Sequence, residues 1–575
     1  MADTKSDIKY VDLNGNVCCI VKVDGNPVLY NQYILSVDAQ SGFNTISDLK
    51  IVLDNIIDEE KELYISDMDI YKLGSEIEVL VGYNEAKVSV FKGSIIKKSV
   101  SSVCSKLTIE AKHAADKMTV ENKCRGFEDQ TIQDTIEAIC GEYGISVKVE
   151  KPGNKSEKRM QNDYSDWDFI NLIAESEGMV VYTTPEGIVV KSILEDLTQQ
   201  EHVLDAIKGY NISTVELEID SRCSHKEYKG KVFDSSTQEA IESSSSVSNL
   251  SQSEENKEAE SVNVVSTGSE ESEQEMDAKQ NTMSARNDLA FLLGKLGLVG
   301  YAPLLPGDMV RLHKVGKGFN GKVLVSSVLH SIGPGSWDTN LEVGFDDTRY
   351  VERFNDIAPK PAMGMLPSVN GLQIAKVEAL AGDPKGEDRI YVRLLNSNDM
   401  KLWCRVATLD AGNKRGSFFM PEKDDEVIVG FIDGNPNSAV ILGMLHSSKA
   451  PVPLEITDDN HVKGFFSREN IQLLFDDEKK ALSVETPGGN KLLISDDEKG
   501  ISLEDQNGNT IVMNDQGITV ESKKALTLKA AQDVSIEGNN VNIKANAQLV
   551  AKGSASAEVS SGGNTVIKGG LVQIN

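Results

Sequence analysis

The feature that most limits the fold of this chain is a short repeat near its C-terminus. Pairs of apolar residues separated by one residue recur between residues 482 and 543, at intervals of seven to ten residues. The pairs are Leu482/Val484, Leu492/Ile494, Ile501/Leu503, Ile511/Met513, Ile518/Val520, Leu526/Leu528, Val534/Ile536 and Val541/Ile543. Turn residues such as Gly500, Gly508 and Gly517 lie between them. Each unit therefore predicts one short strand, with two apolar side chains on one face, followed by a turn.

A unit of this size cannot bury its own apolar face, so the units must stack into a solenoid. A single-chain β-helix uses on the order of twenty residues or more per coil, whereas about eight residues fit one side of a three-chain prism. We therefore predict a needle in which three identical chains intertwine around an apolar core. On the repeat alone, an ordinary β-solenoid and a trimeric adhesin stalk remain alternatives. The predicted needle core consists of Ile501, Leu503, Ile511, Met513, Ile518, Val520, Leu526, Leu528, Val534, Ile536, Val541 and Ile543.

Length, charge and cysteine content narrow the class of protein further. The chain has 575 residues and a formal net charge of −30. This length suits roughly three to five domains. The acidic balance disfavours nucleic-acid binding, because such a surface repels phosphate. The seven cysteines include the adjacent pair Cys18-Cys19 and no CxxC, which indicates buried or inert thiols.

Neither a membrane helix nor a signal peptide is expected. The sequence has no apolar run near the roughly twenty residues that a membrane span requires. The first residues lack the basic and apolar regions of a signal peptide. We therefore expect the chain to be made and folded in the cytoplasm, with any export carried out by a machine rather than directed by a signal.

The sequence of the N-terminal two thirds of the chain predicts mainly β structure. Alternating apolar residues in 1–110 predict a first β-barrel, and a similar pattern in 201–365 predicts a second one. Serine and acidic residues dominate 236–280, within the second barrel. Such a composition cannot bury enough apolar surface to offset its ordering entropy. We therefore predict a flexible acidic loop there.

Residues 111–200 predict a small α/β insertion between the two barrels. The spacing of Ile132, Ile136 and Ile139 places them on one helical face, and Gly141 is expected to end that helix. A second helix is expected after Ser165, whose side chain can cap it. A hairpin of two apolar strands follows this helix.

Residues 366–450 predict a compact barrel of the OB type. Its strands are expected at 390–394, 402–406, 426–431 and 439–443, separated by Gly and Asp turns. Trp403 lies among strand residues, so we expect it to be packed rather than presented to a nucleic acid. A connector, 451–480, leads to the needle and its tip, 481–575. The predicted fold class is thus mainly β and multidomain: two hub β-barrels with small α/β insertions, an OB-fold and a C-terminal trimeric intertwined β-helix.

The OB-like segment closely resembles the corresponding module of the VgrG spike family. The shared stretches include Trp403-Cys404-Arg405-Val406, the run from Met420 to Phe431, and Gly434-Asn435-Pro436, where Asn435 replaces the usual Asp. The helix around Trp167, the Leu305-Pro306-Gly307-Asp308 turn and the C-terminal stretch 565–575 are also similar to that family. The resemblance follows the family's domain order over nearly the whole chain. It extends to the fused hub and needle proteins of contractile phage tails.

The resemblance implies a structural role rather than an enzymatic one. It implies a homotrimer that connects tail tube and baseplate proteins to a needle that punctures a target membrane, with effector cargo as a further partner. It also implies a PAAR-like cap protein on the needle tip. The docking residues expected there are Val566, Ile567, Leu571, Val572 and Ile574. Whether the machine is a type VI secretion system or an extracellular phage-tail-like particle stays open.

No pattern of residues indicates catalysis. The seven histidines are dispersed, and the sequence has no HExxH, G-x-S-x-G or phosphate-binding loop. We therefore expect no catalytic residue, cofactor or metal, and we interpret His330 as a structural histidine. The alternative function is a phage tail spike, adhesin or depolymerase, which would require a surface groove with paired carboxylates or exposed aromatic residues.

Overall fold

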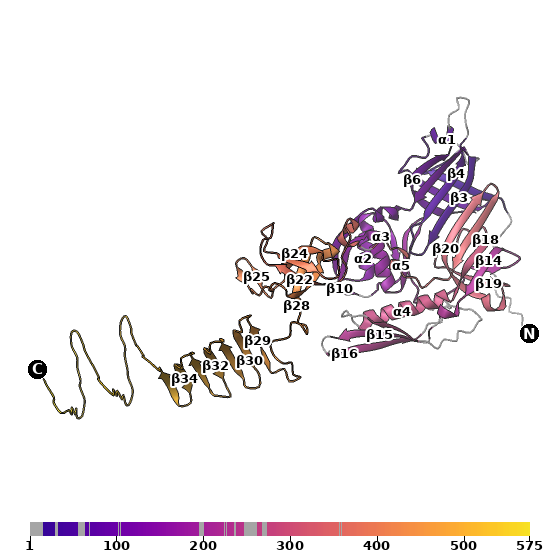
Figure 1. Ribbon diagram of the computed structural model, residues 1–575. Helices are drawn as coiled ribbons and strands as arrows, with labels where there is room; N and C mark the ends of the chain where they lie inside the picture. Colours follow the sequence, from indigo (N-terminus) through magenta and orange to yellow (C-terminus); the bar gives the residue numbers. More distant parts are fainter. Residues whose placement is uncertain are drawn as a thin grey trace, which may run out of the picture. The chain divides into compact units, whose positions relative to one another are not determined.

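The computed structural model describes residues 15–28, 33–55, 64–67, 69–84, 86–101, 103, 105–153, 155–194, 200–223, 225, 227–234, 237, 239–246, 262–266, 273–355, 357 and 359–574. The chain divides into two compact units (Figure 1). The first consists of Met1–Leu372 with Gly430–Ala439, and the second of Gln373–Val429 with Val440–Asn575. Among the helices of the described residues, none has the length and apolar character of a membrane span.

A 13-stranded sheet organises the first unit. Its main path runs β14-β18-β21-β20-β3-β4-β7-β6-β5-β1-β2, and β19 joins β13 to β20. The strands are β1 (Val17–Val23), β2 (Asn26–Pro27), β3 (Ile34–Gly42), β4 (Asp48–Asp54), β5 (Glu76–Tyr83), β6 (Ala86–Ser101), β7 (Lys106–Lys112), β13 (Leu204–Ile207), β14 (Ile212–Ile219), β18 (Leu292–Val299), β19 (Met309–His313), β20 (Gly321–Gly333) and β21 (Ser336–Val343). The alternation of apolar and polar residues in these segments explains why they form strands with one buried face.

The long strand β20 joins the two parts that the sequence predicts as separate barrels. Its first residues pair with β19, and Ser327–Ile332 pair with β3. Two apolar cores result, one around Ile51 and Ile109 and the other around Leu296 and Leu341. Trp337, from the second part, packs into the first core. The strands of both predicted barrels thus belong to one continuous sheet with two apolar cores, and their division into two hub barrels stays a prediction.

The α/β insertion agrees with the sequence patterns. It contains β8 (Asn122–Gln130), α2 (Ile132–Glu142), β9 (Val147–Val149), β10 (Ser156–Ser165), α3 (Asp166–Ser176), β11 (Met179–Thr184) and β12 (Gly187–Ser192). Thr131 and Asp134 form a capping box on α2, and the Ser165 hydroxyl accepts a hydrogen bond from the Asp168 N–H at the start of α3. The apolar stripes of both helices are buried in one core. Helix α2 continues past Gly141 and ends at Tyr143.

Part of the segment predicted as a flexible acidic loop is regular structure. Strand β15 (Glu227–Asp234) lies between β16 (Glu239–Ser246) and β17 (Val262–Ser266), and helix α4 (Glu273–Ala290) follows. Tyr228, Val232 and Met276 are buried there. The loop prediction is therefore wrong for β16, β17 and the start of α4, because paired backbone and an apolar cover offset the polar composition. Residues 236, 238, 247–261 and 267–272 of that prediction lie outside the described residues.

The second unit begins with a closed five-stranded barrel. Its strands are β22 (Gln373–Ala379), β23 (Ile390–Leu394), β24 (Lys401–Val406), β27 (Glu426–Phe431) and β28 (Ala439–Met444), with a small hairpin of β25 (Ala411–Gly412) and β26 (Arg415–Gly416). The four predicted strands are confirmed within a residue. Trp403 is half-buried and packs against Tyr391, with ring centroids 4.8 Å apart and planes tilted by 37°.

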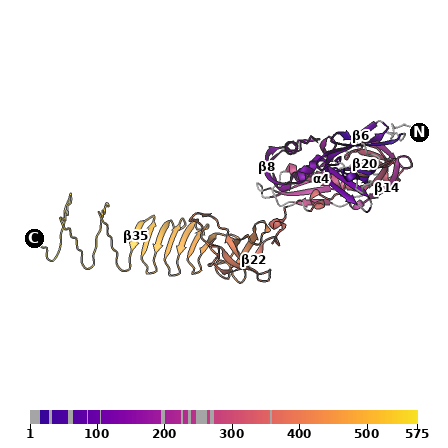
Figure 2. The same cartoon turned by 90° about the horizontal axis from the view of Figure 1, so that it is seen from above.

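A seven-stranded antiparallel sheet, here called the needle sheet, follows the barrel (Figure 2). Its strands are β29 (Val462–Phe466), β30 (Gln472–Asp476), β31 (Ala481–Glu485), β32 (Lys491–Ser495), β33 (Gly500–Glu504), β34 (Thr510–Asn514) and β35 (Gly517–Glu521). Each strand pairs with its neighbours along the chain. The predicted connector 451–480 therefore contains the first two strands of this sheet. The described residues after Glu521 contain no further strand.

Candidate assembly surface

The apolar pairs of the repeat form two straight rows on one face of the needle sheet, here called the apolar face. Each pair lies directly opposite the pair of the next strand: Leu492 faces both Val484 and Leu503, and Ile494 faces both Leu482 and Ile501. The first row is Phe465, Leu473, Val484, Leu492, Leu503, Ile511 and Val520, and the second is Phe475, Leu482, Ile494, Ile501, Met513 and Ile518. Such directly opposed pairs are the units that stabilise an antiparallel sheet.

The opposite face of the needle sheet has a different chemistry. Along its middle, small polar side chains alternate with apolar ones from strand to strand. The polar ones are Ser483, Ser502 and Thr519, and the apolar ones are Leu474, Leu493 and Val512. At one margin Lys491 lies between Glu485 and Glu504. Opposite charges on neighbouring strands are favourable and keep this margin compatible with water. The sheet is therefore two-sided, with one consistently apolar face.

The apolar face is largely uncovered in a single chain. The exposed fractions are 41% for Leu503, 50% for Val520 and 71% for Ile518. A hollow of about 620 Å³ runs along the first row, from Val484 to Leu526. Burying apolar surface of this kind is worth about 25 cal/mol per Å². A contiguous, exposed apolar surface on regular structure indicates an interaction site.

The structure brings together six of the twelve predicted core residues. Ile501, Leu503, Ile511, Met513, Ile518 and Val520 share the apolar face. The other six follow β35, outside any strand, and are exposed: Leu526, Leu528, Val534, Ile536, Val541 and Ile543. The five expected tip residues are also exposed, from 48% for Val572 to 87% for Ile574. Their assignment to a core and a docking tip stays a prediction about the assembled protein.

Sequence reasoning missed three members of the apolar face. Phe465, Leu473 and Phe475 continue its rows into β29 and β30. Leu473 and Phe475 are separated by one residue, like the later pairs, so the same pattern could have identified them. Leu473 lies nine residues before Leu482, within the interval of the later pairs, so the spacing itself marks them as part of the repeat.

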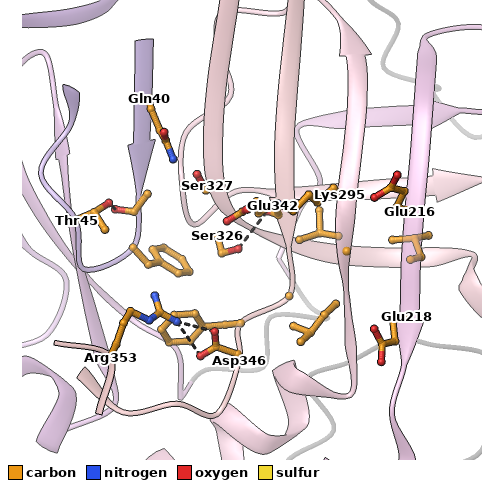
Figure 3. Close-up of a pocket in the computed structure, with 18 residues that line it drawn as sticks. Gln40, Thr45, Glu216, Glu218, Lys295, Ser326, Ser327, Glu342, Asp346 and Arg353 are labelled. Atoms are coloured by element: carbon orange, nitrogen blue, oxygen red, sulfur yellow. Dashed lines mark hydrogen bonds and ion pairs between the residues drawn. The ribbon is translucent and has the colours of Figure 1, made fainter. Parts of the chain in front are cut away.

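A second hollow, of about 550 Å³, lies in the first unit across β3, β20, β21, β18 and β14 (Figure 3). Arg353 Nη2 donates to Asp346 at 2.8 and 2.7 Å, which neutralises both charges. Glu216 and Glu218 of β14 and Lys295 of β18 line it further. The hollow combines aromatic rings with charges of both signs and does not concentrate one kind of charge.

Burial holds several titratable groups of the described core neutral. Burial lowers the pKa of His113 and of His330 to about 4. His330 is buried, with its Nδ1 3.2 Å from the Thr339 hydroxyl. Burial raises the pKa of Cys140 and Cys404 to about 12, whereas Cys124 is exposed. Among the residues that the structure describes, no three His, Cys, Asp or Glu side chains are grouped so as to hold a metal ion.

Three family models match successive parts of the chain. Residues 14–333 match the Alg8 N-terminal domain. Residues 373–446 match the type VI secretion system/phage-baseplate injector OB domain. Residues 481–575 match the phage baseplate V C-terminal trimerisation domain. The OB match spans the closed barrel, and the last match assigns a trimerisation domain to β31–β35 and the residues after them.

Curated relatives and a solved structure are similar to parts of the chain. The type VI secretion system spike protein VgrG5 of Pseudomonas aeruginosa is 28% identical over 189 residues, 29% of this chain and 24% of that protein. VgrG1a of the same species is 27% identical over 155 residues, 25% of this chain and 23% of that protein. The matched part is thus about a quarter of these relatives' length. A 43 kDa tail protein of prophage MuSo2 from Shewanella oneidensis is 13% identical, with a TM-score of 0.45, covering 58% of this chain and 99% of that one.

The closed barrel and the strands β31–β35 coincide with the matched injector OB domain and trimerisation domain. Parts of the chain are thus similar to VgrG spike proteins of type VI secretion systems. The chain's match to the Alg8 N-terminal domain covers more than half of its length, and the chain belongs to that family.

Proposed function

We propose that this chain is the trimeric hub and spike of a contractile injection system. The observation that carries the proposal is the apolar face of the needle sheet. Its first row is continuous over seven strands and its second over six, and many of its side chains are exposed in one chain. Three such faces turned toward a common axis would bury one another, while the margin with Glu485, Lys491 and Glu504 would stay in water.

The remaining parts of the chain fit the other roles in such a machine. The continuous sheet of the first unit would form a hub that contacts tail tube and baseplate proteins. The OB barrel would form a collar, and the repeat would form a needle that transmits force to a target membrane. This role is mechanical and needs no catalytic group. The protein would assemble in the cytoplasm and leave the cell as part of the machine.

Two further partners belong to the proposal. The exposed C-terminal side chains, among them Leu571 and Ile574, would dock a PAAR-like cap protein that sharpens the needle. Effector cargo would travel on the spike or inside the tube. The proposed role of this chain is the same in a type VI secretion system and in an extracellular phage-tail-like particle.

Light scattering of the purified full chain tests the trimer. We expect a mass of about three times 62.6 kDa, with little dissociation on dilution. The apolar face would otherwise remain in contact with water. A folded monomer that persists at micromolar concentration would contradict the proposal.

A further inference from the structure

The loop that joins β24 to β27, residues 407–425 and here called the collar loop, is ordered by its own polar contacts. Arg415 Nη1 donates to Asp410 Oδ1 at 2.6 Å, and the Ser417 N–H donates to the Asp410 carbonyl at 2.9 Å. The hairpin of β25 and β26 lies between these residues. The loop therefore has a defined shape without an apolar core of its own.

Large apolar side chains project from this loop into solvent. The exposed fraction is 92% for Leu409, 83% for Phe418 and 56% for Phe419. The hydrogen bond from the Ser417 N–H to the Asp410 carbonyl pairs the two ends of the hairpin. Leu409 and Phe418 directly flank these two residues, so the hydrogen bond keeps their backbones near each other. An ordered loop that exposes a Leu and two Phe side chains is typical of a contact surface.

The collar loop is also joined to the needle sheet. Phe419 stacks on Phe465 of β29, with ring centroids 5.2 Å apart and planes at 16°. Arg468, which follows β29, donates to Glu422 at 2.6 Å. Phe465 is the first residue of one row of the apolar face. Phe419 therefore joins the collar loop to the first row of the apolar face.

We propose that Leu409 and Phe418 of each collar loop pack against a neighbouring copy of this chain and lock the collar of the trimer. The inference rests on the proposed function, because the occupant is the copy that covers the apolar face. Phe418 directly precedes Phe419, which stacks on Phe465, so a copy that covers Phe465 would lie near Phe418. The contact is heterologous: the loop of one copy meets a different surface of the next, and a threefold rotation closes the ring.

A photo-crosslinking amino acid placed at position 418 of the full chain tests the neighbour directly. We expect irradiation of the purified protein to give covalent dimers and trimers, with the crosslinked peptide mapping to a second copy. The same amino acid at Leu73, which is 65% exposed in the first unit, serves as the control and should give far less product. A trimer that forms no interchain product from position 418 overturns the inference and leaves the proposed function intact. Product within one chain, or equal product from Leu73, also overturns it.

The double variant Leu409→Ser, Phe418→Ser tests how much these two side chains contribute to the stability of the trimer. Both side chains are exposed in the single chain, so the fold should survive. We expect the fraction of dissociated chains at submicromolar concentration to rise about tenfold or more, because two apolar contacts per interface are lost. Leu73→Ser should leave it unchanged. An unchanged dissociation of the double variant contradicts the inference, and a monomeric parent chain contradicts the proposed function instead.

Discussion

At the scale of single residues, position within a needle strand decides what a substitution does. Val520 lies on the apolar face and Thr519 on the opposite face of the same strand, β35. Val520→Asp would bring three like charges into an apolar core, at a cost of several kcal/mol. Thr519→Asp would place the charge in water. We expect Val520→Asp to abolish the trimer and Thr519→Asp to preserve it.

Light scattering and thermal unfolding at matched concentration measure both variants. Because Val520 is half exposed in one chain, the substitution should act on assembly more than on the single chain's fold. Equal behaviour of the two variants would mean that the apolar face does not point to the axis.

His330 predicts a dependence of stability on pH. Burial holds the pKa of His330 at about 4 in the folded chain, below the ordinary value near 6.5. The neutral form is therefore favoured by folding, and its contribution is complete above about pH 6.5 and lost as the pH falls toward 4. Between pH 7 and pH 5 the free energy of unfolding should drop by about 2 kcal/mol from this group. His113, with the same lowered pKa, should add a similar drop.

Urea unfolding followed by tryptophan fluorescence at several pH values measures the effect, since Trp337 lies beside His330 with ring centroids 6.0 Å apart. His330→Gln should lower stability at pH 7 and flatten the acid-side slope. An unchanged slope in this variant would show that other groups cause the acid sensitivity.

At the scale of elements, two turns of the needle sheet have the same hydrogen-bonded geometry. The turn Thr486–Asn490 and the turn Asp505–Asn509 are closed by the same two backbone hydrogen bonds. In each turn the N–H of the first residue donates to the carbonyl of the fifth, and the N–H of the fourth residue donates to the carbonyl of the first. Gly489 and Gly508 occupy the same position with φ of 89° and 81°. Both adopt the left-handed region that favours glycine.

Deleting residues 491–509 should therefore remove β32 and β33 and join β31 directly to β34. Val484 would then take the place of Leu503 opposite Ile511, and every apolar side chain would keep its face. We expect an assembled trimer whose needle is shorter by about 10 Å, two strand spacings, in electron micrographs. Removing only one of these strands reverses the chain direction of all later ones and should disrupt assembly. A monomeric 491–509 deletion would contradict the equivalence of the units.

The sequence predicts those elements whose signals are local. Ser165 and the apolar stripe after it locate α3, and the apolar pairs locate each strand from β31 to β35. The pairing of β20 with β3 depends on residues far apart in the chain, such as His330 and Ala39, and no local pattern reveals it. Strand β16 contains four serines, and its pairing with β15 depends on tertiary context.

The same distinction applies to the candidate surface. The alternation of Ile501, Ser502 and Leu503 is enough to place the apolar side chains on one face. The stacking of Phe419 on Phe465 joins two elements with a turn-rich connector between them, and only the three-dimensional structure shows it. Sequence therefore finds the rows of the apolar face but not their extension onto the collar loop.

At the scale of the whole molecule, the C-terminal end predicts a docking event. Leu571 and Ile574 are 86% and 87% exposed. Deleting residues 570–575 should abolish binding of a purified PAAR-repeat protein in a pull-down, because an apolar end suited to a partner is lost. The trimer should persist, since the apolar face of β31–β35 is unchanged. Retention of the cap by the truncated trimer would place its binding surface elsewhere.

The pairing of each needle strand only with its neighbours along the chain gives the needle sheet a mechanical direction. The hydrogen bonds between strands are perpendicular to the strands and therefore lie along the stacking direction. A push along that direction presses adjacent strands together and loads all the interstrand contacts in compression. A pull along it opens the ladder one strand at a time, from whichever end is held. The needle sheet should therefore resist compression along the stacking direction far better than tension. If the load changed from compression to tension, the strands would separate one after another.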